Sequence, residues 1–374
     1  MCTSLAHYLI LIYKFENLNT KDKMINLKSV KFVMLNVVVL LSVNNLTAQD
    51  KQYQVSCVGF YNVENLFDIY DDTLIRDEEY LPEGKNNWNQ EKYDHKLKNL
   101  SKVIFDMGTD VTPDGCAILG VSEIENKKVL EDLVATEKLK GREYKIVHFN
   151  SPDKRGIDVG LIYQEKYFKV TNSASYEVIF SNGSGYPTRD QLVVSGLLNG
   201  EEVTVLVAHW PSRRGGSAAS EPNRIDAAKV GRRIVDSLYA INPNAKILYM
   251  GDLNDDPINK SVEKYMCAKG KLSKVKEKMF FNPMWAPFKK GNGTLAYHDA
   301  WNLFDQILVS KGFLNETNYS TLSYYKMAVY RKPFLFQHGG RYDGYPLRTR
   351  AGGKYLGGYS DHLPVFITLI KEVK

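Results

Sequence analysis

The sequence predicts an α/β protein built on mixed β-sheets. Runs rich in apolar and β-branched residues alternate with amphipathic helical segments from one end of the chain to the other. Two such runs are joined by Asn-Gly, which is typical of a tight hairpin, and others are separated by helices, which indicates crossovers. Hairpins together with crossovers favour mixed sheets over a purely parallel Rossmann sheet. Of the 374 residues 44% are hydrophobic and 25% charged, which excludes a wholly disordered or collagen-like chain.

The first half of the chain contains five predicted strands and two predicted helices. The first helix is indicated by apolar residues at spacings of four, three, four and three, namely Tyr93, Leu97, Leu100, Ile104 and Met107. A polar loop over 68–91 precedes it, and the second amphipathic helix is expected over 126–139. The strands are expected over 53–61, 115–122, 144–149 and 157–163, followed by 192–198.

The second half opens with the clearest local signal in the sequence. The runs 192–198 and 201–210 flank Asn199-Gly200, so they are predicted to form a hairpin with a primed turn. A helix over 221–240 places Ile225, Ala228, Val235 and Leu238 on one face. The remaining predicted strands are 246–250, 305–310 and 364–370. No internal repeat or low-complexity linker follows residue 50, so we expect one catalytic domain over 50–374.

Residues 1–49 have the pattern of an upstream extension followed by a secretory signal peptide. The pattern consists of a basic flank, a short apolar core and small residues, supplied by Lys28 and Lys31, by 32–43 and by Thr47-Ala48-Gln49. The core is too short to cross roughly 30 Å of hydrocarbon, although an N-terminal membrane anchor is the alternative. We expect translation to start at Met24, cleavage near Ala48 or Gln49, and export to the periplasm, cell surface or medium. No transmembrane span is expected in the mature chain.

Net charge and cysteine content exclude few classes of function. The chain carries +6, and residues 1–49 hold five Lys and two acids, so the mature part keeps +3. A charge this small permits an anionic partner without requiring one. Cys57 and Cys116 lie in apolar runs and are predicted to be buried. With Cys267 they make neither a disulfide framework nor a zinc site.

Polar side chains gather where the predicted strands begin or end. They are Asn62, Glu64, Glu123, Asp158, His209, Asp252, Asn254, Asp305, Asp361 and His362. Each alone is consistent with a turn or a solvated strand end. Gathered at one edge of a sheet, they would repel one another unless an ion occupied the centre. Oxygen ligands such as those of Glu123 and Asn62 suit Mg²⁺ or Mn²⁺, and the lack of a thiolate or His-x-x-x-His set argues against zinc.

In order along the chain, these residues resemble the endonuclease/exonuclease/phosphatase superfamily. The resemblance rests on Asn62, Glu123, His209, GDLND (251–255), FDQILVS (304–310) and SDHLPV (360–365). It covers about 53–370. The superfamily includes pancreatic-type deoxyribonucleases, abasic-site endonucleases, bacterial sphingomyelinases and inositol polyphosphate 5-phosphatases. The resemblance implies a four-layer α/β sandwich in which two mixed β-sheets pack face to face with helices outside.

The resemblance also implies roles for individual residues. Glu123 would be the principal metal ligand, with Asn62 and Asp361 close to the ion. Glu64 falls where some members carry a second acid. Because Asn-x-Glu departs from the commoner Asn-x-Asp, the role of Glu64 stays open. Asp252 would position or deprotonate the attacking water, and Asn254 would bind a phosphoryl oxygen.

Two histidines and one arginine complete the implied site. His362 would contact the phosphate while Asp305 fixes its tautomer. His209 resembles the second catalytic histidine, with Asp158 as its carboxylate partner; the alternative for Asp158 is a turn residue. Arg189 matches a position where relatives place a phosphate-contacting arginine, and the alternative is an exposed hairpin charge.

Two segments without a regular period are predicted to determine the substrate specificity. Arg213 and Arg214, within 210–216, could grip a second phosphate, or this segment could be a flexible surface loop. The segment 323–358 holds seven Lys or Arg, one acid and eight aromatics. That composition suits nucleic-acid backbone contacts with base stacking, and equally a phospholipid surface. Some of the aromatics are expected to pack the loop onto the core.

The predicted function is that of a secreted, Mg²⁺-dependent endonuclease. The alternatives are a phospholipid phosphodiesterase and an inositol-phosphate-type phosphatase. The sequence offers no long exposed apolar hairpin for membrane docking, because Pro283 and Pro287 break the nearest segment, 278–288. An inert binding module is disfavoured because every motif position keeps its functional residue. No protein partner is predicted.

Overall fold

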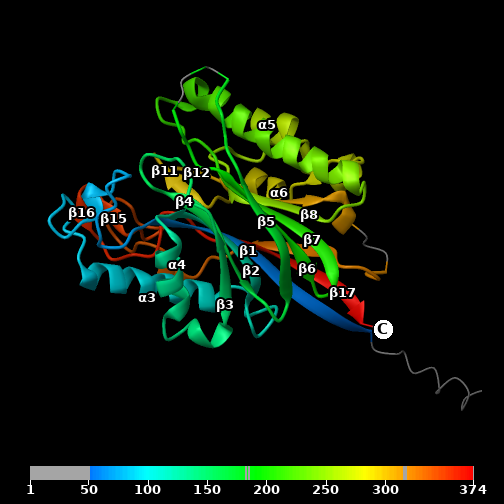
Figure 1. The fold of residues 1–374 in the computed structure, drawn as a ribbon, viewed down its shortest axis with the longest axis horizontal. Coiled ribbons are helices and arrows are strands. Elements are labelled where there is room, and N and C mark those ends of the chain that lie inside the picture. The colour runs from blue at the N-terminus through cyan, green and yellow to red at the C-terminus, as the bar shows by residue number, and fades with distance from the viewer. Residues whose placement is uncertain (1–50, 182, 184–185, 315–317, 374) are drawn as a thin grey trace, which may run out of the picture. The chain divides into compact units, whose positions relative to one another are not determined.

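The computed structural model describes residues 51–181, 183, 186–314 and 318–373. The predicted extension and signal peptide, 1–49, lie outside these residues. Two large sheets dominate the described chain (Figure 1). The first has six strands in the order β14-β17-β1-β2-β4-β3, and the second has seven in the order β5-β6-β7-β8-β13-β10-β9. Parallel pairs, β1 with β2 and β7 with β8, occur among antiparallel neighbours, so both sheets are mixed as predicted.

The strand bounds agree with most of the predicted ranges. The first sheet consists of β14 (Ser323–Val329), β17 (Val365–Val373), β1 (Gln52–Leu66), β2 (Cys116–Ile124), β4 (Asp158–Gln164) and β3 (Tyr144–His148). The second consists of β5 (Phe168–Tyr176), β6 (Gln191–Leu198), β7 (Glu201–His209), β8 (Ile247–Asp252), β13 (Asp305–Ser310), β10 (Phe280–Phe281) and β9 (Ala268–Lys269). The predicted hairpin at Asn199-Gly200 is confirmed as the β6–β7 connection, with Leu198 opposite Glu201.

The helices cover the outer faces of the two sheets. The main ones are α3 (Gln90–Asp106), α4 (Lys127–Ala135) and α5 (Ser217–Ile241). Asn89 and Asn126 cap α3 and α4, because their side chains accept from the backbone amides of Lys92 and Val129. The helix expected over 126–139 ends earlier, at Ala135, where Thr136 leaves the helical conformation.

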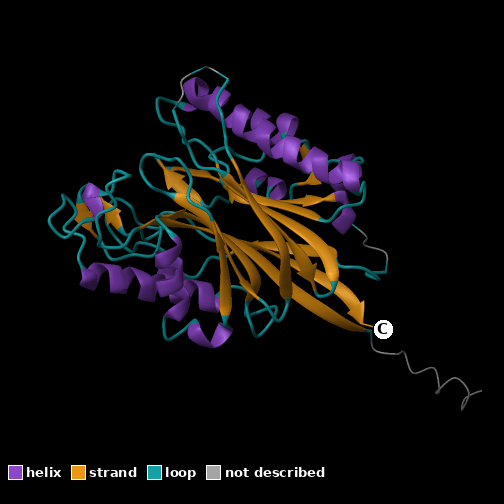
Figure 2. Cartoon of the chain, in the orientation of Figure 1, coloured by secondary structure: helices purple, strands orange, loops and turns teal. Residues whose placement is uncertain are grey.

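Three apolar layers hold four layers of secondary structure together (Figure 2). The first lies between the first sheet and α3 and α4, and includes Leu100, Val121 and Leu130. The second lies between the sheets, and the third lies between the second sheet and α5. The four-layer sandwich implied by the resemblance is therefore the observed architecture. Cys57 and Cys116 are fully buried, as predicted, with sulfur atoms 3.0 Å apart.

Besides short strands of two or three residues, the prediction missed two long strands, β5 and β14, and both lie at sheet edges. β5 pairs only with β6, and most of its side chains are exposed or half-buried. β14 pairs only with β17 and belongs to the segment 323–358, which was treated as irregular. An edge strand with one solvated face needs few apolar residues, so it leaves a weak pattern in the sequence. Among the described residues, no helix is long and apolar enough to cross a membrane.

Glu201 ties the two sheets together at the end of the sandwich where β7 begins. Its carboxylate lies 2.5 Å from Lys246 Nζ and 2.7 Å from Lys371 Nζ, and it accepts the amide of Leu322. Lys371 belongs to β17 of the first sheet, whereas Glu201 belongs to the second. Burial alone would raise the pKa of Glu201, but the two lysines and the amide hold it below its ordinary value.

Replacing Glu201 by glutamine is expected to destabilise the fold by about 1–2 kcal/mol at pH 7, because two half-buried lysines lose their counter-charge. The depressed pKa means that this stabilisation is present above the unfolded-state pKa and is lost as the pH falls through the folded-state value. The difference should therefore shrink in acid. Urea denaturation at pH 7 and below pH 4 measures it, with Glu202→Gln on the exposed neighbour as control. A pH-independent difference would contradict this account.

Candidate active site

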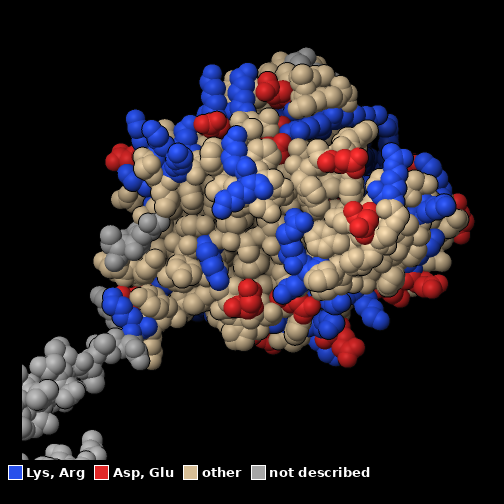
Figure 3. All heavy atoms as spheres, turned by 180° about the vertical axis from the view of Figure 1, so that it is seen from behind, with Lys and Arg blue, Asp and Glu red and all other residues tan. Residues whose placement is uncertain are grey.

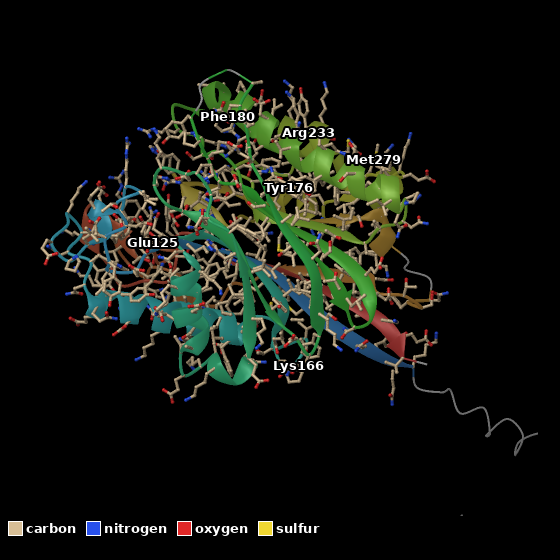
Figure 4. All side chains as sticks on the ribbon, in the orientation of Figure 1. Glu125, Lys166, Tyr176, Phe180, Arg233 and Met279 are labelled. Carbon is tan, nitrogen blue, oxygen red and sulfur yellow. The ribbon has the colours of Figure 1, made fainter. Side chains whose placement is uncertain are left out.

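Strand register brings the predicted polar residues to one end of the sandwich. In the second sheet, Asp252 at the end of β8 lies opposite His209 on β7 and opposite Asp305 on β13. In the first sheet, Asn62 and Glu123 lie near the ends of the paired strands β1 and β2. Glu125, just beyond β2, marks this end in Figure 4, and Lys166, just beyond β4, marks the opposite end.

Asp252 lies at the centre of the cluster. Asn62 reaches it across the gap between the sheets, because Nδ2 donates to Asp252 Oδ2 at 3.1 Å. The same amide donates to Glu123 Oε1 at 3.3 Å. The Nε2 atoms of His209 and His362 lie 3.6 and 3.7 Å from Asp252 Oδ2. Two imidazoles thus flank one buried carboxylate, with Glu123 beside them.

His362 forms the predicted dyad with Asp305. Nδ1 of His362 lies 2.7 Å from Asp305 Oδ2, so the imidazole presents Nε2 to Asp252. Burial lowers the pKa of His362, but Asp305 and Asp252 outweigh it and hold that pKa well above its ordinary value. Ser360 fixes the backbone at this point, since Oγ donates to the Asn62 carbonyl and accepts the amide of His362. The imidazole is therefore oriented, and it carries a positive charge near neutrality.

His209 and Asp252 titrate in opposite directions. Burial, followed by the charges of Arg189, Arg155 and His362, holds the pKa of His209 well below its ordinary value. Burial raises the pKa of Asp252 to about 7, against the opposing pull of His362. His209 is therefore neutral where His362 is charged, and the two rings differ in protonation state on either side of Asp252. Such a separation of roles is common at acid–base sites.

Backbone strain concentrates at the site. Glu64, Glu123 and Asn254 have φ values of 51°, 62° and 49°, in the left-handed region that non-glycine residues rarely adopt. Asn254 is held there because its amide donates to Asp252 Oδ1 and its side chain donates to the Trp210 carbonyl. Gly251 is required because a Cβ atom would lie 2.0 Å from the carbonyl oxygen of Ala208.

Glu64 and Asp361 contact an arginine that the sequence reasoning did not single out. Arg348 Nε lies 3.4 Å from Glu64 Oε1, and the guanidinium also pairs with Asp361. The other oxygen of Glu64 accepts the amide of Thr349 at 2.6 Å. The contacts of Glu64 thus hold the Arg348–Thr349 loop, which is a different task from the metal ligation considered for it. Arg348 lies in the predicted substrate segment 323–358. The high content of basic residues in this segment was the only feature of the sequence that pointed to Arg348.

Asp158 and Arg189 lie elsewhere than predicted. The carboxylate of Asp158 lies 2.9 Å from His148 Nε2 and accepts from Ser151, so the structure pairs it with His148 rather than with His209. Among the described residues, His209 Nδ1 has no hydrogen-bond partner. Arg189 is buried, and it donates to Asp153 at 3.2 Å and to the Trp210 carbonyl at 2.7 Å. It supports the segment that follows His209 through this bond to the Trp210 carbonyl.

Arg213 and Arg214 have different surroundings. Arg213 Nε donates to the Asn254 carbonyl at 2.9 Å, and the guanidinium lies 3.3 and 3.1 Å from the carboxylates of Asp255 and Asp256. It therefore secures the loop that carries Asp252 and Asn254. Arg214 is exposed on the surface.

A sequence profile described as the Endonuclease/Exonuclease/phosphatase family matches residues 57–371. The chain belongs to this family. Its members are hydrolytic phosphoesterases that depend on a divalent metal ion, and the buried acid and histidine cluster is consistent with that chemistry. A search of curated proteins found no match.

Solved structures of the endonuclease/exonuclease/phosphatase family share the fold at low identity. A family protein from Bacteroides thetaiotaomicron has a TM-score of 0.52 and 17% identity, covering 86% of this chain and 100% of its own. Humanized D. rerio TDP2 has a TM-score of 0.50 and 14% identity over 84% of this chain and 98% of its own. The human Nocturnin catalytic domain has a TM-score of 0.50 and 13% identity over 86% and 98%. At these identities the likeness shows the fold alone.

The donor set fits a divalent cation. Glu123, Asn62 and Asp252 offer hard oxygen atoms, and Glu123 is the more accessible carboxylate, with 15% of its side chain exposed against 2% for Asp252. Burial raises the pKa of Asp252 to about 7, and the carboxylates of Asp305 and Glu123 add to that rise, so a bound cation would favour the ionised form of Asp252. A thiolate ligand is absent from this cluster in the described chain. When bound, such a cation supplies charge stabilisation for a phosphoryl oxygen.

The side chains can perform the remaining steps of phosphoester hydrolysis. Neutral His209 and the Asp252 carboxylate can orient a water molecule and accept its proton. Charged His362 can hold a phosphoryl oxygen or stabilise the leaving oxygen, because Asp305 fixes its ring with Nε2 facing the site. The Nε2 atoms of both histidines lie within 4 Å of Asp252 Oδ2, so the three side chains can act on one bound phosphate.

Lys96 of α3 anchors the loop that carries Arg348. It is 1% exposed, and Nζ donates to Thr349 Oγ1 at 2.5 Å and to the Tyr359 carbonyl at 2.8 Å. Lys96→Met is expected to lower the free energy of unfolding by roughly 2–4 kcal/mol, because it removes a buried cation from beside Glu64 and leaves its acceptors unpaired. Urea denaturation measures the loss, with exposed Lys98→Met as the matched control. Equal stability of the two variants would show that Lys96 is dispensable.

Proposed function

We propose that this chain is an exported, Mg²⁺-dependent phosphodiesterase that hydrolyses nucleic acid. The observation that carries the proposal is the pair of imidazoles, His209 and His362, whose Nε2 atoms lie 3.6 and 3.7 Å from Asp252 Oδ2, with Glu123 adjoining. This arrangement supplies a proton acceptor, an anchor for a phosphoryl oxygen and oxygen ligands within one site. Its geometry serves a phosphodiester, whose leaving oxygen needs stabilisation as the bond breaks.

The rim of the site favours a polymer over a compact substrate. Two hollows of about 330 and 280 Å³ lie on either side of Arg348 and share it together with Ala351 and Gly352. Their lining includes the basic residues Lys85, Arg341 and Arg350. A substrate that bears phosphates on both sides of the scissile bond would use both hollows, whereas a phosphomonoester would fill one.

Charged side chains of both signs are mixed on the face of the molecule shown in Figure 3. On this face, Lys and Arg side chains are spread widely and acidic side chains lie among them. This distribution agrees with the small net charge of the mature part. It favours recognition by the cleft itself over broad electrostatic attachment to a charged surface.

The deciding experiment presents the purified chain, residues 50–374, with three substrates in Mg²⁺ or in chelator. The substrates are a single-stranded oligonucleotide together with plasmid DNA, sphingomyelin liposomes, and a soluble phosphomonoester. Mg²⁺-dependent cleavage of the nucleic acid is expected. Hydrolysis of only the lipid or only the monoester would reject the nuclease assignment, and chelator-resistant cleavage would reject the metal requirement. Mass spectrometry of the exported protein tests cleavage near Ala48.

A further inference from the structure

A hollow of about 330 Å³ is lined by Ala296, the neighbour of Leu295, which forms a β-bridge with His362. One wall is the hairpin of β11 (Leu295–Tyr297) and β12 (Ala300–Asn302), and the other is the loop 337–348. Leu295 forms a β-bridge with His362, and the amide of Leu363 donates to the Thr294 carbonyl at 2.8 Å. Arg348, which pairs with Asp361, completes the wall. The hollow therefore adjoins the segment that carries Asp361 and His362, through Arg348 on one side and the strand of Leu295 on the other.

The two walls are fastened to each other. Tyr345 Oη donates to Asp299 Oδ1 at 2.5 Å and accepts the amide of Asp299 at 2.7 Å. The hairpin tip that presents Asp299 is strained, since His298 and Asp299 have φ values of 48° and 59°. Glycine would adopt this turn more easily, so side chains are kept here at a conformational cost. The hollow is thus formed before any ligand enters, which lowers the entropic penalty of binding.

Aromatic faces and a guanidinium line the hollow. Tyr297 is 66% exposed and Tyr342 is 45% exposed, although each ring also contacts one neighbour, His298 at 4.2 Å and Tyr345 at 5.5 Å between ring centres. The Arg341 guanidinium lies 5.7 Å from the Tyr342 ring centre. Exposed rings with an adjacent cation match a nucleobase and its phosphate, which bind by stacking and by charge. The volume is at the low end for small-ligand sites and suits one nucleotide.

From these observations we propose that the hollow binds one unpaired base of a single-stranded nucleic acid, next to the phosphate being cleaved. Tyr297 and Tyr342 stack on the base, and Arg341 faces the adjoining phosphate. A base inside a duplex is paired and stacked on its neighbours, so it does not enter such a pocket without being flipped out. This inference rests on the proposed function and deepens it, because it selects single strands over duplexes.

The test compares Tyr297→Ala/Tyr342→Ala with the wild type on two oligonucleotides of equal length. One carries all its bases, and the other is abasic on either side of the cleaved phosphate. KM for the base-bearing strand is expected to rise by about 10- to 100-fold, the effect of losing base stacking, while KM for the abasic strand stays unchanged. Tyr297→Phe/Tyr342→Phe should restore the wild-type KM. Tyr325→Ala, which removes a tyrosine that is 54% exposed on β14, is the matched control.

Hydrolysis of bis(4-nitrophenyl) phosphate separates the possible failures. Wild-type turnover of this ester by the double alanine variant shows that the reacting centre is intact. If the wild type cleaves oligonucleotides and the variant changes KM for both strands equally or for neither, the base subsite is wrong and the proposed function stands. If the wild type hydrolyses the simple ester but no oligonucleotide, the proposed function and the subsite both fall.

Discussion

His362→Ala is expected to reduce turnover by more than about 100-fold, the usual contribution of a positioned acid or base. The imidazole is buried, bound to Asp305 at 2.7 Å and aimed at Asp252, so water cannot take over its task in the same geometry. Steady-state hydrolysis of a diester measures the loss. Circular dichroism and a thermal melt verify that the fold survives.

His95→Ala is the matched control for His362→Ala, because His95 is exposed on α3 and its ring hydrogen-bonds to Tyr355. The turnover of Asp305→Asn is expected to lie between those of His95→Ala and His362→Ala. The amide of asparagine still accepts a hydrogen bond from the His362 ring, but it lacks the charge that stabilises the protonated ring. Retention of more than half of the turnover by His362→Ala would show that the dyad has a structural role.

Glu123→Gln is expected to abolish the Mg²⁺ dependence that the donor set predicts. Glutamine preserves the shape and one acceptor for the Asn65 amide, which now donates to Glu123 Oε2 at 3.0 Å, so the strand end should keep its conformation. Turnover should fall by at least ~100-fold. Independently of activity, Mg²⁺ at 100 times its dissociation constant should stabilise the wild type by about 2.7 kcal/mol and leave the variant unchanged.

Thermal melts with and without Mg²⁺ read out this stabilisation, and Glu131→Gln on the exposed face of α4 is the control. A variant that still melts at a higher temperature in Mg²⁺ would place the ion on other carboxylates, of which Asp252 is the first candidate because it shares the Asn62 amide with Glu123. A wild type insensitive to both Mg²⁺ and Mn²⁺ would contradict the cation site.

Predictions that depended on strongly patterned segments were confirmed by the fold. The β6–β7 hairpin was visible because Asn199-Gly200 favours a primed turn, and α3 was visible because its apolar residues recur at helical spacing. Edge strands β5 and β14 were not predicted, because one face of each strand lies in water and therefore carries few apolar residues. A similar limit applies to Arg348, whose task depends on a loop with no regular period.

The contact partners of charged side chains were the hardest feature to predict from the sequence. Arg189 and Arg213 were expected to bind phosphate, but their guanidinium groups bind Asp153 and the Asp255–Asp256 pair inside the protein. Asp158 was paired with His209 on the basis of the resemblance, and in the structure it contacts His148, ten residues before it in the chain. A side chain's partner depends on which strands are neighbours and on which face of the sheet is buried. The spacing of residues along the chain determines neither.

The sequence by itself determined the family, the two-sheet architecture and the set of residues at strand ends, because strand ends and turns are encoded by short-range chemistry. Only the tertiary structure decided which carboxylate lies between the two histidines, which arginine faces Glu64 and Asp361, and where a pocket adjoins the site. Those choices arise from contacts between Asn62 and Asp252, 190 residues apart, and between Arg348 and Glu64, 284 residues apart. The first of these distances is closed when the two sheets pack face to face, and the second when β14 and β17 join β1 in the first sheet.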